Sequence, residues 1–221
     1  MHHHDNSQKR IYRKNAVYFI TANTHLRYPY FREDIFCELF IQELHLGQQI
    51  HGFKLFAYTI NPDHVHLLIQ PNSVSDYSKI MHFLKRNFSR NINKILFPIR
   101  DDDNGHHEGE DGHHEGEDDH PRLHGAYHNH NGNHNNHPRV RTTSPLSYFD
   151  KTIKIYFDKF KSKYGGGHPF PKFKWQESFY DHIIRDDADF YKHVQYIKIQ
   201  WIKHGLVGNK WCYVLPRLDS E

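Results

Sequence analysis

The sequence predicts an α+β fold in which helices pack on one face of an antiparallel, ferredoxin-like sheet. Segments rich in β-branched and aromatic residues alternate with segments whose apolar residues recur every three to four positions. Their order is β-α-β-β-α, an insertion, then β-α and a short tail strand. With 221 residues, the chain has the length of one ordinary domain, so we expect a single domain over residues 1–221.

The first half of the chain predicts three strands and two helices. Residues 16–24 (AVYFITANT) favour a strand, and residues 32–50 an amphipathic helix. Residues 53–60 and 64–70 form a predicted hairpin, since only three residues, one of them proline, separate them. Residues 76–96 predict a second helix, whose buried stripe is formed by Tyr77, Ile80, Leu84, Phe88, Ile92 and Ile95.

The second half predicts a helix over residues 147–163 and a strand over residues 172–180 (KFKWQESFY). A last helix begins at Arg185-Asp186-Asp187, where acidic residues suit the positive end of a helix, and closes at Gly205. A short tail strand is expected near residues 211–214.

A low-complexity insertion separates the two halves at about residues 101–144. It holds ten of the 26 acidic residues and three of the 29 basic ones, and the heptapeptide GHHEGED occurs in it twice in tandem. Its few apolar residues cannot offset the entropy lost on ordering, so we expect a disordered and dispensable segment. Its ten histidines are also weak ligands for transition metals, which leaves a metal-handling protein as an alternative.

The rest of the chain is basic, with 26 positive and 16 negative residues, a net charge of +10. Together with 15% aromatic residues, this composition favours a polyanion such as nucleic acid, although a mildly basic soluble fold is compatible with it. The two cysteines lack CxxC spacing, and no segment resembles a membrane span or a signal core. We therefore expect a cytoplasmic protein with no membrane partner.

Two histidines lie two residues apart on the predicted strand 64–70. Alternation sends Val65 and Leu67 toward the core and His64 and His66 to the other face. Two imidazoles at this spacing can hold one divalent ion. Paired histidines on strands are, however, often no more than half-buried polar residues.

The last predicted helix carries a polar row beside its apolar stripe. At about 100° per residue, Phe190, Val194, Ile197 and Trp201 form the stripe, and the row contains His193, Tyr196, Gln200 and Lys203. Tyr196 and Gln200 lie one turn apart. If this row meets the strand face that carries His64 and His66, then a metal, a third ligand and a nucleophile come together.

These motifs resemble a known family. Asn61-Pro62-Asp63-His64-Val65-His66 is similar to the His-hydrophobe-His signature of the HUH endonucleases, in the form of the single-tyrosine transposases of small insertion sequences. Residues 173–207 resemble the second half of the REP-associated tyrosine transposases, from Trp175-Gln176 through Asp181-His182 to Lys203-His204-Gly205. The resemblance covers nearly the whole chain outside residues 101–170. Relatives usually carry Asn-Pro one turn after the tyrosine, where this chain has Gln200-Trp201.

The resemblance implies an enzyme that cleaves and rejoins single-stranded DNA through a covalent 5′-phosphotyrosine, with Mg²⁺ or Mn²⁺ as cofactor. By position, Tyr196 matches the nucleophile, and His64, His66 and Gln200 match the metal ligands. His193 and Lys203 are candidates for activating the phenol. The implied partner is single-stranded or hairpin DNA, bound by a monomer or by a homodimer that exchanges tyrosine helices.

Five cations are candidates for contacts with the DNA backbone: Arg86, Arg90, Lys94, Lys172 and Lys174. The first three line up at spacings of four on one face of the helix 76–96, a pattern that is also typical of a solvated helix face. Two further functions stay open. One is a non-catalytic ferredoxin-like module that binds single-stranded nucleic acid, and the other is a domesticated nuclease that no longer transposes.

Overall fold

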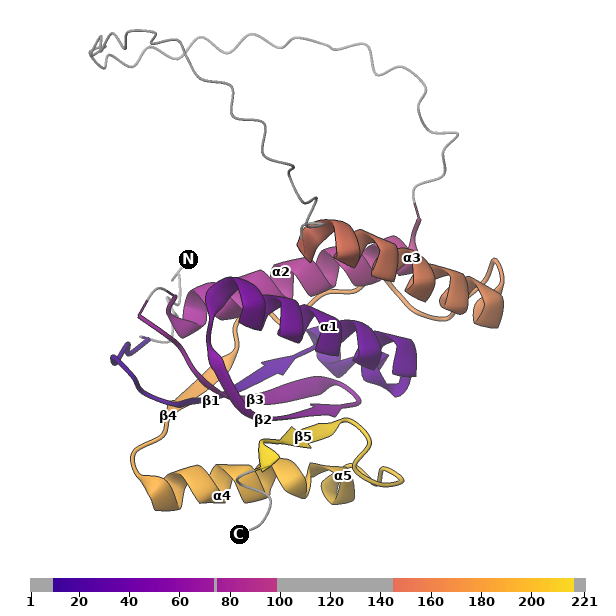
Figure 1. The fold of residues 1–221 in the computed structure, drawn as a ribbon. Coiled ribbons are helices and arrows are strands. Elements are labelled where there is room, and N and C mark those ends of the chain that lie inside the picture. Colours follow the sequence, from indigo (N-terminus) through magenta and orange to yellow (C-terminus); the bar gives the residue numbers. More distant parts are fainter. Residues whose placement is uncertain (1–9, 74, 99–144, 217–221) are drawn as a thin grey trace, which may run out of the picture.

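The computed structural model describes residues 10–73, 75–98 and 145–216 (Figure 1). The predicted insertion at residues 101–144 lies outside the described residues. None of the helices described is long and apolar enough to cross a membrane. The described elements, apart from two short 3-10 turns, are β1(Tyr18–Asn23), α1(Asp34–His51), β2(Lys54–Asn61), β3(His64–Gln70), α2(Tyr77–Leu96), α3(Pro145–Tyr164), β4(Tyr180–Ile183), α4(Asp187–Lys198), α5(Gln200–Lys203) and β5(Cys212–Val214).

The five described strands form one antiparallel sheet in the order β4-β1-β3-β2-β5. Strands β2 and β3 form the predicted hairpin, in which Asn61 lies opposite His64 and Thr59 opposite His66. On the other side of β3, Asn23 of β1 lies opposite His64. The α+β class and the antiparallel, ferredoxin-like sheet are therefore confirmed.

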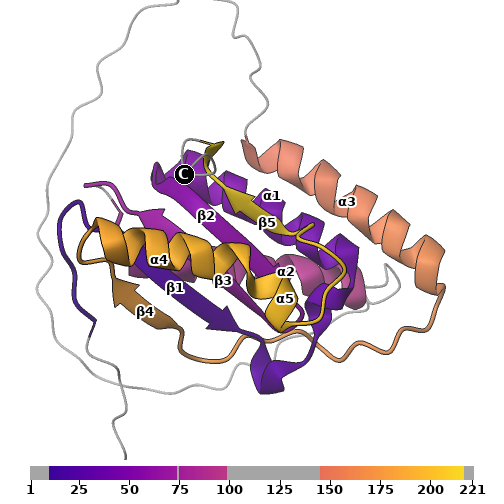
Figure 2. The same cartoon turned by 90° about the horizontal axis from the view of Figure 1, so that it is seen from below.

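The helices cover both faces of the sheet, which corrects the prediction that they pack on one face. Helices α1 and α2 lie on one face with α3 against them, whereas α4 and α5 lie on the opposite face (Figures 1 and 2). The reason is that the central strands are apolar on both sides. Phe19 and Leu68 point away from α1 and α2, and they are buried against Val194 and Ile197 of α4.

Helix α2 has the predicted boundaries and core face. Asp76 caps its N-terminus by accepting a hydrogen bond from the backbone N–H of Lys79. All six residues of the predicted stripe are buried. They pack with α1 and with the sheet face that α1 and α2 cover, in the larger of the two hydrophobic clusters of the described residues.

The predicted strand over residues 172–180 is wrong, because regular pairing begins only at Tyr180. The alternating aromatics of this segment are buried, but its backbone runs irregularly along α2. The Asn93 side chain both accepts from the N–H of Phe173 and donates to its carbonyl oxygen, taking the place of a neighbouring strand. Its backbone pairs at one bridge, between Trp175 and Thr24, next to the end of β1.

The last helix begins as predicted but is interrupted before Gly205. Asp186 caps α4 by accepting from the backbone N–H of Asp189. The chain leaves helical geometry at Ile199, and the short α5 continues to Lys203. Gly205 follows with φ 59°, a left-handed conformation that glycine adopts without strain.

Candidate active site

Two buried histidines form the floor of the candidate site, on the sheet face covered by α4 and α5. His64 and His66 are 6% and 3% exposed, and their Nε2 atoms lie 3.1 Å apart. Burial lowers the pKa of both imidazoles, that of His66 to about 3, and the neighbouring His204 lowers both pKa values further. Both rings are therefore neutral at physiological pH, which is the form that ligates metals.

The other nitrogen of each ring is held by a neighbouring side chain. The Nδ1 atom of His64 lies 2.6 Å from a carboxylate oxygen of Asp63, and the Nδ1 atom of His66 lies 2.8 Å from the Thr21 hydroxyl. Partners of this kind fix ring orientation in metal-binding histidines. They leave the two Nε2 atoms facing each other at about the separation of neighbouring ligands around one divalent ion. The pair therefore fits a divalent metal ion.

Helices α4 and α5 bring Tyr196 and Gln200 onto these histidines. The ring centroids of Tyr196 and His66 lie 5.3 Å apart in an edge-to-face arrangement. Gln200 is 1% exposed, donates from Nε2 to the Tyr196 carbonyl oxygen at 3.0 Å, and also hydrogen-bonds to His66. The ammonium of Lys203 lies 4.1 Å from the centroid of the Tyr196 ring, a cation–π contact.

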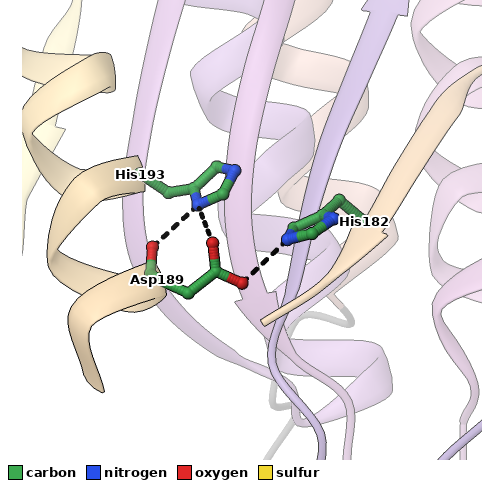
Figure 3. Close-up of side chains that lie close together, drawn as sticks. All are labelled: His182, Asp189 and His193. Carbon is green, nitrogen blue, oxygen red and sulfur yellow. Dashed lines mark hydrogen bonds and ion pairs between the residues drawn. The ribbon is translucent and has the colours of Figure 1, made fainter. Parts of the chain in front are cut away.

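His193 belongs to a second cluster, which joins β4 to the first turns of α4 (Figure 3). Asp189 accepts hydrogen bonds from His182 at 2.8 Å, and from the backbone N–H and Nε of Arg185 at 3.1 and 3.2 Å. The Nδ1 atom of His193 donates to the Asp189 carbonyl oxygen and lies 3.3 Å from its carboxylate. Burial opposes ionisation of Asp189, but the hydrogen bonds from His182 and Arg185 outweigh it and hold the pKa of this carboxyl below its usual range.

This cluster is the only group of three histidine, cysteine or acidic side chains within the described residues whose ligand atoms lie within 4.8 Å of one another. It could hold a metal ion, yet its ligand atoms already form hydrogen bonds with one another and with the backbone. These contacts tie His182 of β4 to Asp189 and His193 of α4, and we call these three residues the clamp. Because His193 lies one turn before Tyr196 and its ring contacts Phe19 beneath the site, the clamp sets the position of α4 over the histidines.

The predicted DNA contacts are not beside the histidines. Arg86 and Lys174 line a groove of about 730 Å³ together with the nitrogen-bearing side chains of Arg10, His82 and Lys85 and the acidic side chain of Glu177. This groove lies along α2, on the other face of the sheet from α4. The remaining predicted contacts, Arg90, Lys94 and Lys172, are exposed but do not line it. The row of cations on α2 therefore does not run beside the two histidines.

One contact nevertheless connects the groove with the site. Gln176 lines the groove, and its Oε1 atom accepts a hydrogen bond from Nδ2 of Asn23 at 2.9 Å. Asn23 is the cross-strand neighbour of His64. The groove and the histidines thus approach the same end of β1 from opposite faces.

Sequence reasoning missed four residues of the site. Asp63 and Thr21 orient the imidazoles, Asn61 contacts His64, and the ring of His204 lies 5.0 Å from that of His64. A signal for His204 was present, since it follows Tyr196 and Gln200 at the same spacing of four. Thr21 and Asn61 are cross-strand neighbours of the histidines, which only the strand register identifies, and Asp63 is the turn residue directly before His64.

Comparisons with known proteins find similarity to transposases. Residues 13–111 match the family described as "Transposase IS200 like". A curated protein of Haemophilus influenzae described as a REP-associated tyrosine transposase is 23% identical over 208 residues, which cover 93% of this chain and 82% of the relative. The solved structure of a REP-associated tyrosine transposase bound to a REP hairpin has a TM-score of 0.52 at 16% identity, covering 91% of this chain and 76% of that one.

Proposed function

We propose that this chain cleaves and rejoins single-stranded DNA through Tyr196, because residues 13–111 match the IS200-like transposases and the chain is similar in sequence and fold to REP-associated tyrosine transposases. The observation that carries the proposal is the convergence of Tyr196 and Gln200 on His66. These residues come from elements more than a hundred positions apart in the sequence. A sheet that only bound nucleic acid would have no need for this convergence.

The proposed metal ligands are His64, His66 and Gln200, and the proposed ion is Mg²⁺ or Mn²⁺. Two neutral imidazoles with an amide oxygen suit these ions and leave coordination positions for a phosphate. When bound, the ion would polarise the scissile phosphate and offset the charge that develops on it.

The chemical step belongs to Tyr196. Its phenol loses a proton to solvent, the phenolic oxygen forms a bond to phosphorus, and the bond between phosphorus and the 3′ oxygen breaks. The 3′ oxygen takes up a proton from solvent and leaves as a hydroxyl. Lys203, whose ammonium lies against the Tyr196 ring, stabilises the phenolate. Because the phosphotyrosine stores the bond, attack by a 3′ hydroxyl reverses the step without ATP.

The groove along α2 is the proposed contact for the DNA backbone. Its cations Arg86 and Lys174 suit phosphates, and the aromatic ring of Phe179 lies beneath the guanidinium of Arg10 at 3.7 Å. The homologous structure was solved with a REP hairpin, so we propose hairpin DNA as the ligand of this groove. The single strand leaving the hairpin would then pass the end of β1 to reach Tyr196.

The test is covalent capture of labelled hairpin DNA in the presence of Mn²⁺, resolved on a denaturing gel. The wild-type chain should form an adduct, whereas Tyr196→Phe should form none and bind the hairpin nearly as tightly, since the ring and its packing are kept. Tyr191→Phe, on the same helix but on its exposed side, is the matched control and should form the adduct.

Two results would count against the proposal. Adduct formation by Tyr196→Phe would place the nucleophile at another residue. Hairpin binding by the wild-type chain without any adduct, over a range of Mn²⁺ and Mg²⁺ concentrations, would favour a non-catalytic binding module.

A further inference from the structure

The side-chain amide of Asn61 is in an unusual position beside the proposed metal site. Asn61 ends β2 opposite His64 and is fully buried. Its Nδ2 atom lies 3.0 Å from Nε2 of His64, but its Oδ1 atom has no hydrogen-bond partner among the described residues. A buried carbonyl oxygen without a hydrogen-bond partner lowers the stability of the fold, so the presence of an asparagine at this position needs an explanation.

The amide donates to the lone pair that a metal ion would use. The contact between Nδ1 of His64 and the Asp63 carboxylate places a proton on Nδ1, which leaves the Nε2 lone pair of His64 to accept from Asn61. A ligand to a metal cannot also accept this hydrogen bond through the same lone pair. A half-turn of the planar Asn61 amide exchanges the two groups without changing its shape and brings Oδ1 toward Nε2 of His64.

The distances around His64 fit a third ligand. The Asn61 amide group and Nε2 of His66 lie 3.0 and 3.1 Å from Nε2 of His64. Neighbouring ligands at right angles around an ion with bonds of about 2.0 to 2.3 Å are separated by about 3 Å. We propose that Asn61 is a further metal ligand through Oδ1, an inference that rests on the metal dependence of the proposed function.

The proposed ligand adds a second amide oxygen to the set of donors. Two imidazole nitrogens with the amide oxygens of Asn61 and Gln200 are harder ligands, on average, than two imidazole nitrogens with one amide oxygen. Harder ligands favour Mg²⁺ and Mn²⁺ over Zn²⁺. Four protein ligands also leave two of six positions, enough for a phosphate oxygen and one water.

Asn23 offers a matched control on the other side of the same histidine. It is the cross-strand neighbour of His64 in β1, and its Oδ1 atom also has no partner among the described residues. Its Nδ2 atom, however, donates to Oε1 of Gln176 at 2.9 Å, which holds the amide in its present orientation. We therefore expect no role for Asn23 in binding the ion.

The experiment measures Mn²⁺ binding by the full, metal-free chain in the absence of DNA. Electron paramagnetic resonance of free Mn²⁺ gives the affinity, and water proton relaxation gives the number of waters on the bound ion. Asn61→Ala should lower the affinity by about tenfold or more and add one bound water. Asn61→Asp keeps the shape and the oxygen and adds a negative charge, so it should bind Mn²⁺ more tightly with an unchanged water count. Asn23→Ala should stay within about twofold of wild type.

Asn61→Asp keeps the test decisive if the alanine variant fails to fold, which thermal melts of the metal-free proteins would show. The inference would be overturned if Asn61→Ala bound Mn²⁺ with the same affinity and water count as the wild type, or if Asn61→Asp bound Mn²⁺ more weakly. Either result would leave the proposed active site standing. Equal losses in Asn23→Ala and Asn61→Ala would also overturn it, by showing a general effect of polarity. If His64→Ala bound Mn²⁺ as tightly as wild type, the ion would bind elsewhere, and both the inference and the proposed metal site would fall.

Discussion

Replacing Asp189 with asparagine should destabilise the fold and slow DNA cleavage through one cause, the loss of the clamp that positions α4. Asp189 is 7% exposed and accepts three hydrogen bonds from His182 and Arg185. A hydrogen bond to a buried charged group contributes about 1.5 to 3 kcal/mol, and a neutral amide oxygen recovers part of each. The net loss should be about 2 to 4 kcal/mol, which lowers the melting temperature by roughly 5 to 15 °C for a chain of this size.

The dependence on pH identifies the charge as the cause. Because the folded-state pKa of Asp189 is depressed, its contribution is fully present above the ordinary pKa of an aspartate, about 4, and is lost as the pH falls through the folded-state value. The stability difference between wild type and Asp189→Asn should therefore be constant near pH 7 and shrink below about pH 4. Urea denaturation followed by circular dichroism measures it.

The matched control is Asp187→Asn, which removes an exposed carboxylate from the same first turn of α4. It should cost only the interaction with the helix dipole, about 0.3 to 1 kcal/mol. Covalent capture of hairpin DNA by Asp189→Asn should fall at least tenfold, since a displacement of about 1 Å at a reacting group costs up to about a hundredfold in rate. Equal midpoints for Asp189→Asn and Asp187→Asn would refute the reasoning.

Three further predictions concern other parts of the molecule. Burial raises the pKa of Glu43 to about 7, so the free energy of unfolding of the wild type should fall as the pH rises from about 4.5 to 7. Glu43→Gln can still accept from Asn91 and should remove this decline, which stabilises the fold by up to about 3 kcal/mol at pH 8. Urea titrations measure the difference. Lys203→Met should slow adduct formation by about twofold to fivefold while leaving hairpin affinity nearly unchanged, because it removes an exposed cation–π contact of about 0.5 to 1 kcal/mol. An unchanged rate would dismiss a role for this cation. The double variant Arg86→Ala, Lys174→Ala should weaken hairpin binding and lower the slope of log affinity against log salt concentration by about two. Filter binding at several salt concentrations measures the slope, and the affinity for Mn²⁺ should stay unchanged as the control.

The fold was predictable wherever a local pattern coincides with the tertiary role of a segment. The hairpin of β2 and β3 and the buried stripe of α2 follow from alternation and from helical periodicity. Residues 172–179 broke the rule, because Phe173 and Trp175 are buried against α2 and the sheet through an irregular backbone held by Asn93. Alternating aromatics indicate burial on one side of a segment, and they do not identify the partner of its backbone.

The candidate site was predictable in its principal residues and not in their surroundings. The phase of the last helix placed Tyr196 and Gln200 in one row, and strand alternation placed His64 and His66 on one face. Thr21, which orients His66, and Asn61, which contacts His64, come from neighbouring strands, so their roles depend on register, which the sequence leaves undetermined before the sheet is known. The same holds for Asn61 and Asn23, which both lie opposite His64: the Asn61 amide contacts His64, whereas the Asn23 amide donates to Gln176.

The clamp at Asp189 also bears on whether the chain acts as a monomer or as a dimer that exchanges tyrosine helices. In the structure of the single chain, α4 packs on the sheet to which its own β4 belongs. Only three residues connect β4 with α4, and the backbone N–H of Arg185 within this connection donates to Asp189. Exchange of α4 would require this connection to swing out and would break the contact between His182 and Asp189 that joins the two elements. We therefore expect the site to assemble within a monomer. Light scattering combined with covalent capture at decreasing protein concentration measures this, and adduct formation that falls with the square of the protein concentration would contradict it.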